Sequence, residues 1–197
     1  MRRAFTAVVL AAGALALSAG AANVQSITLR LNDGFVVKGT NIVCAVQLSK
    51  TLVPGAKLIS CFLETRQGPV VKSYTVALAV NGEVALARVG KGSKITVVEK
   101  LGGGPVTKTA PRSAQGRVYN AKVGSAFLVK GTAITCGATT EKFGGKPATT
   151  VACFKVDRSK KPQPGSYGIG ITDGGAFLVH FDSKSRAVPV KIVEHGK

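Results

Sequence analysis

Apolar and polar residues alternate with a period of two along much of the chain, which is typical of β-strands with one buried face. The clearest segments are 40–48, 57–64 and 74–80, where every second side chain is apolar. Asn81-Gly82 follows the third segment, and this dipeptide favours a two-residue hairpin turn. Shorter strands are expected at 27–31, 35–37 and 94–99. After the first twenty residues, no segment has the period of a long amphipathic helix.

The same pattern then occurs a second time. Residues 35–44, read as F-V-V-K-G-T-N-I-V-C, return at 127–136 as F-L-V-K-G-T-A-I-T-C, a shift of 92 positions. Cys61-Phe62 returns at Cys153-Phe154 with the same shift. Later matches, such as Ser73-Tyr74 with Ser166-Tyr167, have slightly larger shifts because insertions collect in loops. We interpret this as a tandem duplication.

The fold class expected is all-β: a tandem pair of small, disulfide-stapled β-sandwich or barrel-like units of about six strands each, preceded by a signal peptide. The boundaries are a signal peptide at 1–21, a first β repeat at 22–99, a Gly/Pro/basic linker at 100–117 and a second β repeat at 118–197. The linker contains Gly102-Gly103-Gly104-Pro105, a composition typical of connecting segments.

The N-terminus has the three parts of an export signal. Arg2 and Arg3 form a basic start, residues 4–17 are apolar, and Ala19-Gly20-Ala21 supplies the small residues that a signal peptidase recognises. We therefore expect a secreted or extracytoplasmic (cell-envelope) protein with no transmembrane segment after cleavage. A leader retained as a membrane anchor is the alternative, although the apolar stretch is short for a bilayer core of about 30 Å.

Four cysteines in an exported chain are expected to be oxidised. Three pairings are possible, and the equal spacing within the two repeats favours Cys44–Cys61 and Cys136–Cys153. Each cysteine lies on the apolar face of its expected strand, so each bridge should be buried. The spacing is unlike that of redox-active or zinc-binding pairs.

The chain is strongly basic, with 27 Lys and Arg residues against nine Asp and Glu and a formal net charge of +18. Loss of Arg2 and Arg3 with the leader would leave +16, spread over both repeats and the linker. Such a charge attracts polyanions, and it also keeps a secreted protein soluble. The chain has no Trp and only three Tyr, so it has few of the stacking platforms that sequence-specific nucleic-acid readers use.

A serine hydrolase triad is not supported by the residues around the first histidine. His180 precedes Asp182 on an expected strand, and Ser166 or Ser183 could be drawn toward it. No G-x-S-x-G motif accompanies these serines, and the position matching His180 in the first repeat is Ala87. We expect His180 to be a surface strand residue.

Other catalytic and metal-binding patterns are also weak. Glu99 and Glu194 occupy matching positions and would form a carboxylate pair only if they converged between the repeats. Asp173-Gly174-Gly175 fits a turn better than a calcium loop, because no series of oxygen ligands follows it. His195 lies in the C-terminal tail and is expected to be solvated. We expect no catalytic site, no metal and no cofactor.

Basic residues in the connecting loops are the remaining candidates. Charged side chains in the loops of a β scaffold can contact polyanions. The alternative is that they lie in solvated turns and bind nothing. The candidate contacts are Arg66, Lys72, Lys91, Lys94, Lys155, Arg158, Lys160, Lys161, Lys184 and Arg186.

Three functional classes follow from these features. The first is an exported non-enzymatic protein that associates electrostatically with anionic cell-envelope or extracellular material, without sequence-specific nucleic-acid recognition. The second is a protein-binding module, such as an inhibitor of a secreted acidic hydrolase, presenting the loop 48–57. A secreted hydrolase is third.

Overall fold

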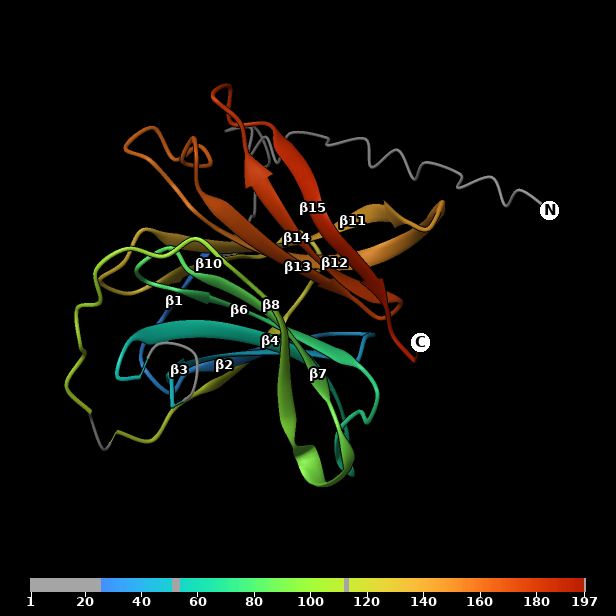
Figure 1. Ribbon diagram of the computed structural model, residues 1–197. Helices are drawn as coiled ribbons and strands as arrows, with labels where there is room; N and C mark the ends of the chain where they lie inside the picture. Colours follow the sequence, from blue (N-terminus) through green and yellow to red (C-terminus); the bar gives the residue numbers. More distant parts are fainter. Residues whose placement is uncertain (1–25, 51–53, 112–113, 197) are drawn as a thin grey trace.

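Fifteen β-strands and one short 3-10 turn, Lys91–Ser93, form the regular structure in a computed structural model that describes residues 26–50, 54–111 and 114–196 (Figure 1). The all-β expectation is confirmed. The expected leader, 1–21, lies outside the described residues.

The strands form two sheets, and in both of them neighbours along the chain are mostly antiparallel neighbours in space. The eight-stranded sheet has the order β8-β7-β6-β4-β3-β2-β9, with β5 paired to β4, and its members are β2 (Gly34–Val37), β3 (Ile42–Leu48), β4 (Lys57–Thr65), β5 (Gly68–Pro69), β6 (Tyr74–Ala79), β7 (Val84–Val89), β8 (Ile95–Leu101) and β9 (Val118–Ala121). The seven-stranded sheet has the order β1-β10-β11-β12-β13-β14-β15, with β1 (Ser26–Leu29), β10 (Ala126–Val129), β11 (Ile134–Phe143), β12 (Lys146–Lys155), β13 (Tyr167–Thr172), β14 (Gly175–Phe181) and β15 (Ala187–Glu194).

Two short strands are exchanged between the halves of the chain. Strand β1, from the first half, pairs in parallel with β10, while β9, from the second half, pairs in parallel with β2. The registers are reciprocal, since Ser26 pairs with Ala126 and Gly34 pairs with Val118. Val118 lies 92 positions after Ser26, and Ala126 lies 92 positions after Gly34. Each sheet is therefore completed by a strand from the opposite half.

A single hydrophobic core lies between the two sheets. Its fully buried side chains come from both, and strands β6 and β7 pack across it against β13 and β14. The rings of Phe35 and Phe127 stack in this core, with their centroids 3.7 Å apart. The expectation of a separate sandwich or barrel for each repeat is therefore wrong: each half supplies most of one sheet, and the sandwich forms between the halves. A sheet with one apolar face needs a second layer, and here the other sheet provides it.

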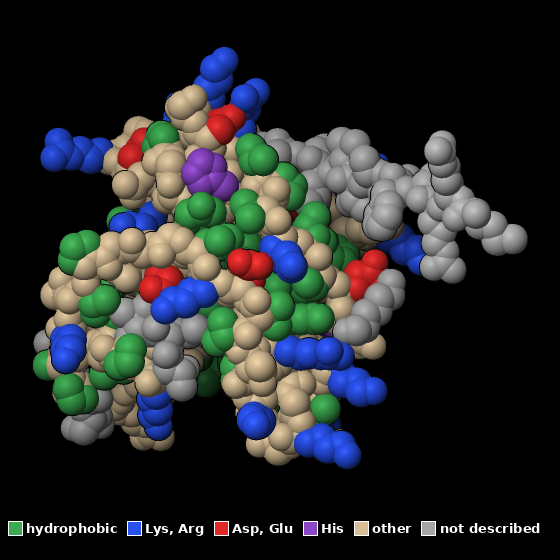
Figure 2. Space-filling model, viewed as in Figure 1, with side chains coloured by type: hydrophobic (Ala, Val, Ile, Leu, Met, Phe, Trp, Pro, Cys, Tyr) green, Lys and Arg blue, Asp and Glu red, His purple; other side chains and the backbone are tan. Residues whose placement is uncertain are grey.

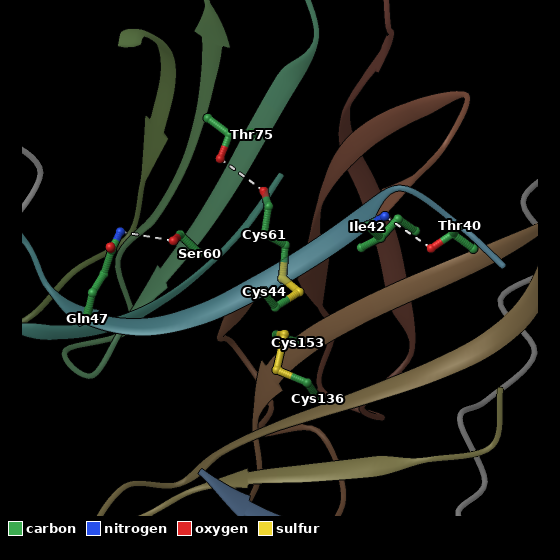
Figure 3. Close-up of a disulfide and its surroundings, with 9 residues drawn as sticks. All are labelled: Thr40, Ile42, Cys44, Gln47, Ser60, Cys61, Thr75, Cys136 and Cys153. Carbon is green, nitrogen blue, oxygen red and sulfur yellow. Dashed lines mark hydrogen bonds between the residues drawn. A yellow bond between two sulfur atoms is a disulfide. The ribbon is translucent and has the colours of Figure 1, made fainter. Parts of the chain in front are cut away.

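Both disulfides lie in this core. Cys44 is bonded to Cys61 across the β3–β4 pair, and Cys136 to Cys153 across β11–β12, as the equal spacing predicts. The two bridges face one another between the sheets, and all four cysteines are fully buried (Figure 3). Each bridge joins strands that already pair, so it fixes the register of a hairpin at the centre of its sheet.

The repeated K-G-T segments form two turns of the same kind. The Thr40 hydroxyl donates to the Val37 carbonyl and accepts from the Ile42 N–H (Figure 3). Thr132 makes the matching bonds with Val129 and Ile134. Gly39, with φ +84°, precedes Thr40 in a left-handed conformation that favours glycine.

The expected linker contains no strand in its described residues beyond Leu101, where β8 ends, but it is hydrogen-bonded to two segments at one end of the eight-stranded sheet. Thr109 N–H donates to the Gly55 carbonyl, and Arg117 carbonyl accepts from Gly34 N–H. The connection therefore passes along the end of the sheet where β3 ends and β2 begins, on its way from β8 to β9 (Figure 1).

Candidate functional site

Four of the basic candidates lie at one end of the eight-stranded sheet. Arg66 follows β4, Lys72 precedes β6, and the remaining two, Lys91 and Lys94, lie in the β7–β8 connection. Lys72 N–H donates to the Val89 carbonyl, which joins these segments. All four side chains are exposed. We refer to them as the first basic cluster.

The other six lie at the corresponding end of the seven-stranded sheet. They come from the end of β12, the following loop and the β14–β15 connection, and the Gly165 N–H donates to the Phe181 carbonyl where these segments meet. All but the half-buried Lys155 are exposed. This second basic cluster comprises Lys155, Arg158, Lys160, Lys161, Lys184 and Arg186.

The two clusters lie at opposite ends of the molecule. Strand β15 begins immediately after Arg186, and beyond its other end the Gly196 N–H donates to the carbonyl of Lys72. A strand of eight residues spans about 26 Å, which separates the clusters by about that length. Lys and Arg side chains project at the top of the view in Figure 2, where the β14–β15 connection lies, and near its lower end, below β7 and β8.

The carboxylates of the second cluster are already engaged by their own turns. Asp157 accepts hydrogen bonds from the Ser159 hydroxyl and from the N–H groups of Ser159 and Lys161. Asp182 accepts from the N–H groups of Lys184 and Arg186, and it pairs with the Arg186 guanidinium at 2.7 Å.

These bonds favour the ionised carboxylates. The Ser159 hydroxyl is the main cause that holds the pKa of Asp157 below its usual value, and the Arg186 N–H is the main cause that lowers the pKa of Asp182. Within the described ranges, Arg186 is the one candidate contact that forms an ion pair, so the other five members of the cluster are better placed to meet an external anion.

A third basic feature lies where the exchanged strands reach the edge of the sandwich. A pocket of about 310 Å³ is lined by Thr28, Arg30, Asp33, Arg117, Tyr119 and Lys130. Sequence reasoning missed this site, because its cationic residues are distant in the chain and adjoin strands whose exchange no local pattern indicates.

The two histidines have different surroundings. His180 lies opposite Tyr167 on β13, with the rings edge-on at 5.1 Å, and Asp182 accepts hydrogen bonds within the β14–β15 turn. The expectation of a solvated His195 is wrong. Its Nδ1 accepts from the Tyr74 N–H at 2.9 Å, and its Nε2 lies 3.0 Å from the Thr172 carbonyl oxygen.

His195 therefore joins the start of β6 to the end of β13, across the two sheets. Burial is the main cause that lowers its pKa, against the raising effects of the Thr172 carbonyl and Asp173. Because Nδ1 is an acceptor here, the proton of the neutral ring lies on Nε2 and is donated to Thr172.

Two of the remaining acidic candidates contact groups from the other half of the chain. The Asp173 carboxylate accepts from the Asn41 N–H, and Glu99 lies 3.9 Å from the Lys191 ammonium of the other sheet. The described part of the chain holds no group of three His, Cys, Asp or Glu residues able to bind a metal. The centre of the loop proposed for an inhibitor, residues 51–53, lies outside the described residues.

The environment of the protein is indicated by its cysteines. Two buried disulfides are typical of proteins in oxidising, extracytoplasmic compartments. Over residues 26–50, 54–111 and 114–196, no helix has the length and apolar character needed to cross a membrane.

Comparison with known proteins gives no relative for this chain. No protein-family model matches it, and neither the curated proteins nor the solved structures contain a match. Functional inference therefore depends on the geometry of the chain itself.

Proposed function

We propose that this protein is an exported, non-enzymatic protein that associates electrostatically with anionic polymers of the cell envelope or its surroundings, through basic clusters at both ends of its sandwich. The observation that carries the proposal is the grouping of ten cations, in loops and at the end of β12, into two clusters about 26 Å apart. The nearby Asp157 and Asp182 are used by their own turns, so they compete little with an external anion.

Two clusters at opposite ends suit a long, flexible ligand better than a small one. Once one cluster holds a polymer, the other meets the same chain at a raised effective concentration, which strengthens weak contacts without any new interface. Phosphate or sulfate groups along the polymer would meet exposed Lys and Arg side chains, and this kind of contact carries little sequence information.

Export and duplication are part of the same proposal. The basic start, apolar stretch and small residues of 1–21 support an export signal, and the buried disulfides suit the compartment that it would lead to. The reciprocal registers of β1 and β9 and the matching K-G-T turns support an ancestral duplication. A duplicated unit explains why each sheet carries its basic cluster at the corresponding end.

Equilibrium binding to heparin and to a DNA duplex tests the proposal. Replacing Lys72, Lys91 and Lys94 by Gln removes three charges from the first cluster, and replacing Arg158, Lys160 and Lys161 does so in the second. Each triple variant should bind both polyanions about tenfold more weakly, since three lost contacts at about 0.5 kcal/mol each sum to about 1.5 kcal/mol at exposed sites.

A matched control separates cluster contacts from net charge. Replacing Lys38, Lys142 and Lys146 by Gln also removes three exposed charges, but outside both clusters. This control should bind nearly as tightly as the parent. Equal weakening in all three variants would show that only the total charge matters, and binding unchanged in the cluster variants would refute the proposal.

A further inference from the structure

The pocket between the exchanged strands is built differently from the basic clusters. Its three cationic residues adjoin three different strands: Arg30 follows β1, Arg117 precedes β9 and Lys130 follows β10. All three side chains are exposed, and among the described residues none of the ion pairs involves them. The site therefore concentrates positive charge that no ion pair within the described residues neutralises.

Strand exchange places two of these cations side by side. Leu29 of β1 pairs in parallel with Val129 of β10, and the Lys130 N–H donates to the Leu29 carbonyl at 2.8 Å. Arg30 and Lys130 are the residues that follow this pair. Their side chains lie side by side, because residues in parallel register project from the same face. Without β1 in the opposite sheet, this pair would not form.

One buried carboxylate holds the backbone at both arginines. Asp33 is 4% exposed, and its two oxygens accept the Arg30 N–H at 2.7 Å and the Arg117 N–H at 2.9 Å. Asp33 thus fixes two arginines that are distant in the chain, while its oxygens face their backbone rather than compete for their guanidinium groups. It is a positioning residue for the pocket.

We propose that this pocket binds a phosphate monoester group. Three cations and one carboxylate leave an excess of two positive charges, which a phosphate dianion would neutralise. The planar forks of Arg30 and Arg117 match phosphate oxygens, and Thr28 and Tyr119 add hydroxyl donors. The volume of about 310 Å³ is at the small end for ligand pockets, which suits a phosphate group with a small organic remainder. This site shares no residue with the two basic clusters, and its proposal does not depend on the proposed polymer binding.

The chain provides a matched control at the other exchanged strand. There Val37 pairs with Ala121 and the Lys38 N–H donates to the Ala121 carbonyl, so Lys38 and Lys122 form the counterpart of the Lys130 and Arg30 pair. In the sequence, the counterpart of Arg117 is Gln25 and the counterpart of Asp33 is Ser125. The matching positions therefore supply two cations, but neither a third cation nor a carboxylate.

The proposal is tested by titrating the purified protein with glycerol 3-phosphate, inorganic phosphate and acetate at fixed ionic strength. Binding is measured by calorimetry and by amide chemical-shift changes in NMR spectra. We expect saturable binding of glycerol 3-phosphate, with shifts centred on Arg30 and Arg117, and weaker binding of acetate. Binding of inorganic phosphate with no gain from the ester would assign the site to free phosphate rather than to an ester, and would overturn the monoester.

R30Q/R117Q should weaken binding about a hundredfold, and K130Q about tenfold, since a charge-assisted hydrogen bond contributes roughly a factor of ten. K38Q/K122Q, which removes the same charge as the first variant, should bind like the parent, as should R158Q/K160Q/K161Q. Unfolding curves confirm that each variant is folded. Equal weakening by K38Q/K122Q, acetate binding as tight as that of the ester, or no saturation would overturn the proposal, whatever the outcome with heparin.

Discussion

The rings of Phe35 and Phe127 lie parallel, with 1° between their planes and 3.7 Å between their centroids, although 92 positions separate the two residues in the chain. They occupy matching places in the repeated F-x-V-K-G-T segments, and both are fully buried. A residue stacked on its own counterpart is the pattern of a two-fold interface. The relationship places the centre of the core between the halves of the chain.

Removing either ring should therefore lower the free energy of unfolding by a similar amount. Phe35→Ala and Phe127→Ala should each lower the free energy of unfolding by about 3–5 kcal/mol, and the double variant should lose less than the sum because the stacking is lost only once. Denaturant unfolding measures this, with the exposed Leu128→Ala as a control near zero. A large loss from one phenylalanine alone would contradict a shared central core.

Protonation of His195 should loosen the contact between the sheets. Its pKa is lowered in the folded protein, so the unfolded chain takes up the proton at a higher pH than the folded one does. The stabilising effect is complete above about pH 6.5, the ordinary histidine pKa, and is lost as the pH falls through the lower pKa of the folded state. The loss is on the order of 1 kcal/mol, because a protonated Nδ1 cannot accept from Tyr74 N–H.

Unfolding free energies of the parent and of His195→Gln between about pH 4.5 and 7.5, a range that brackets the ordinary histidine pKa, would measure this effect. The variant should be less stable at the upper end and should have a flatter profile through that range. A variant with the same slope as the parent would assign the pH dependence to other groups.

Glycines in β13 leave room for aromatic rings on the outer face of the seven-stranded sheet. The Phe177 ring lies over Gly170, its partner across the β13–β14 pair, so that an added Cβ would overlap the ring. Gly170→Ala should destabilise the protein by about 1–3 kcal/mol through this overlap. Gly137→Ala, on β11 with open space at its Cβ, is the matched control and should change thermal stability little. Equal effects would show that strand flexibility, rather than the ring, explains the glycine.

The local part of the fold could be predicted from the sequence, because its signals lie between neighbours in the chain. Alternation marks strands such as β3 and β4, Asn81-Gly82 marks the turn between β6 and β7, and equal spacing gives the disulfide partners. The basic clusters could be anticipated for the same reason, since hairpin loops must emerge at strand ends.

The exchanged strands could not be predicted. Strand β1 has four residues, of which Ile27 and Leu29 are buried, and this short alternation fits the edge of either sheet equally well. No hairpin turn ties it to its partner, because a parallel pair has no local connection. The pocket depends on this exchange and on Asp33, which joins Arg30 to Arg117. It could not be predicted either, because these contacts join residues that are distant in the chain.

The salt dependence of binding to a DNA duplex tests whether the two basic clusters bind polyanions. For double-stranded DNA, the logarithm of the binding constant falls with the logarithm of salt concentration by about 0.9 per neutralised phosphate. We predict that R158Q/K160Q/K161Q reduces the steepness of this slope by about 2–3, that K72Q/K91Q/K94Q does the same, and that K38Q/K142Q/K146Q leaves the slope unchanged. Slopes that remain at the parent value in both cluster variants would show that neither cluster contacts the phosphates of the duplex.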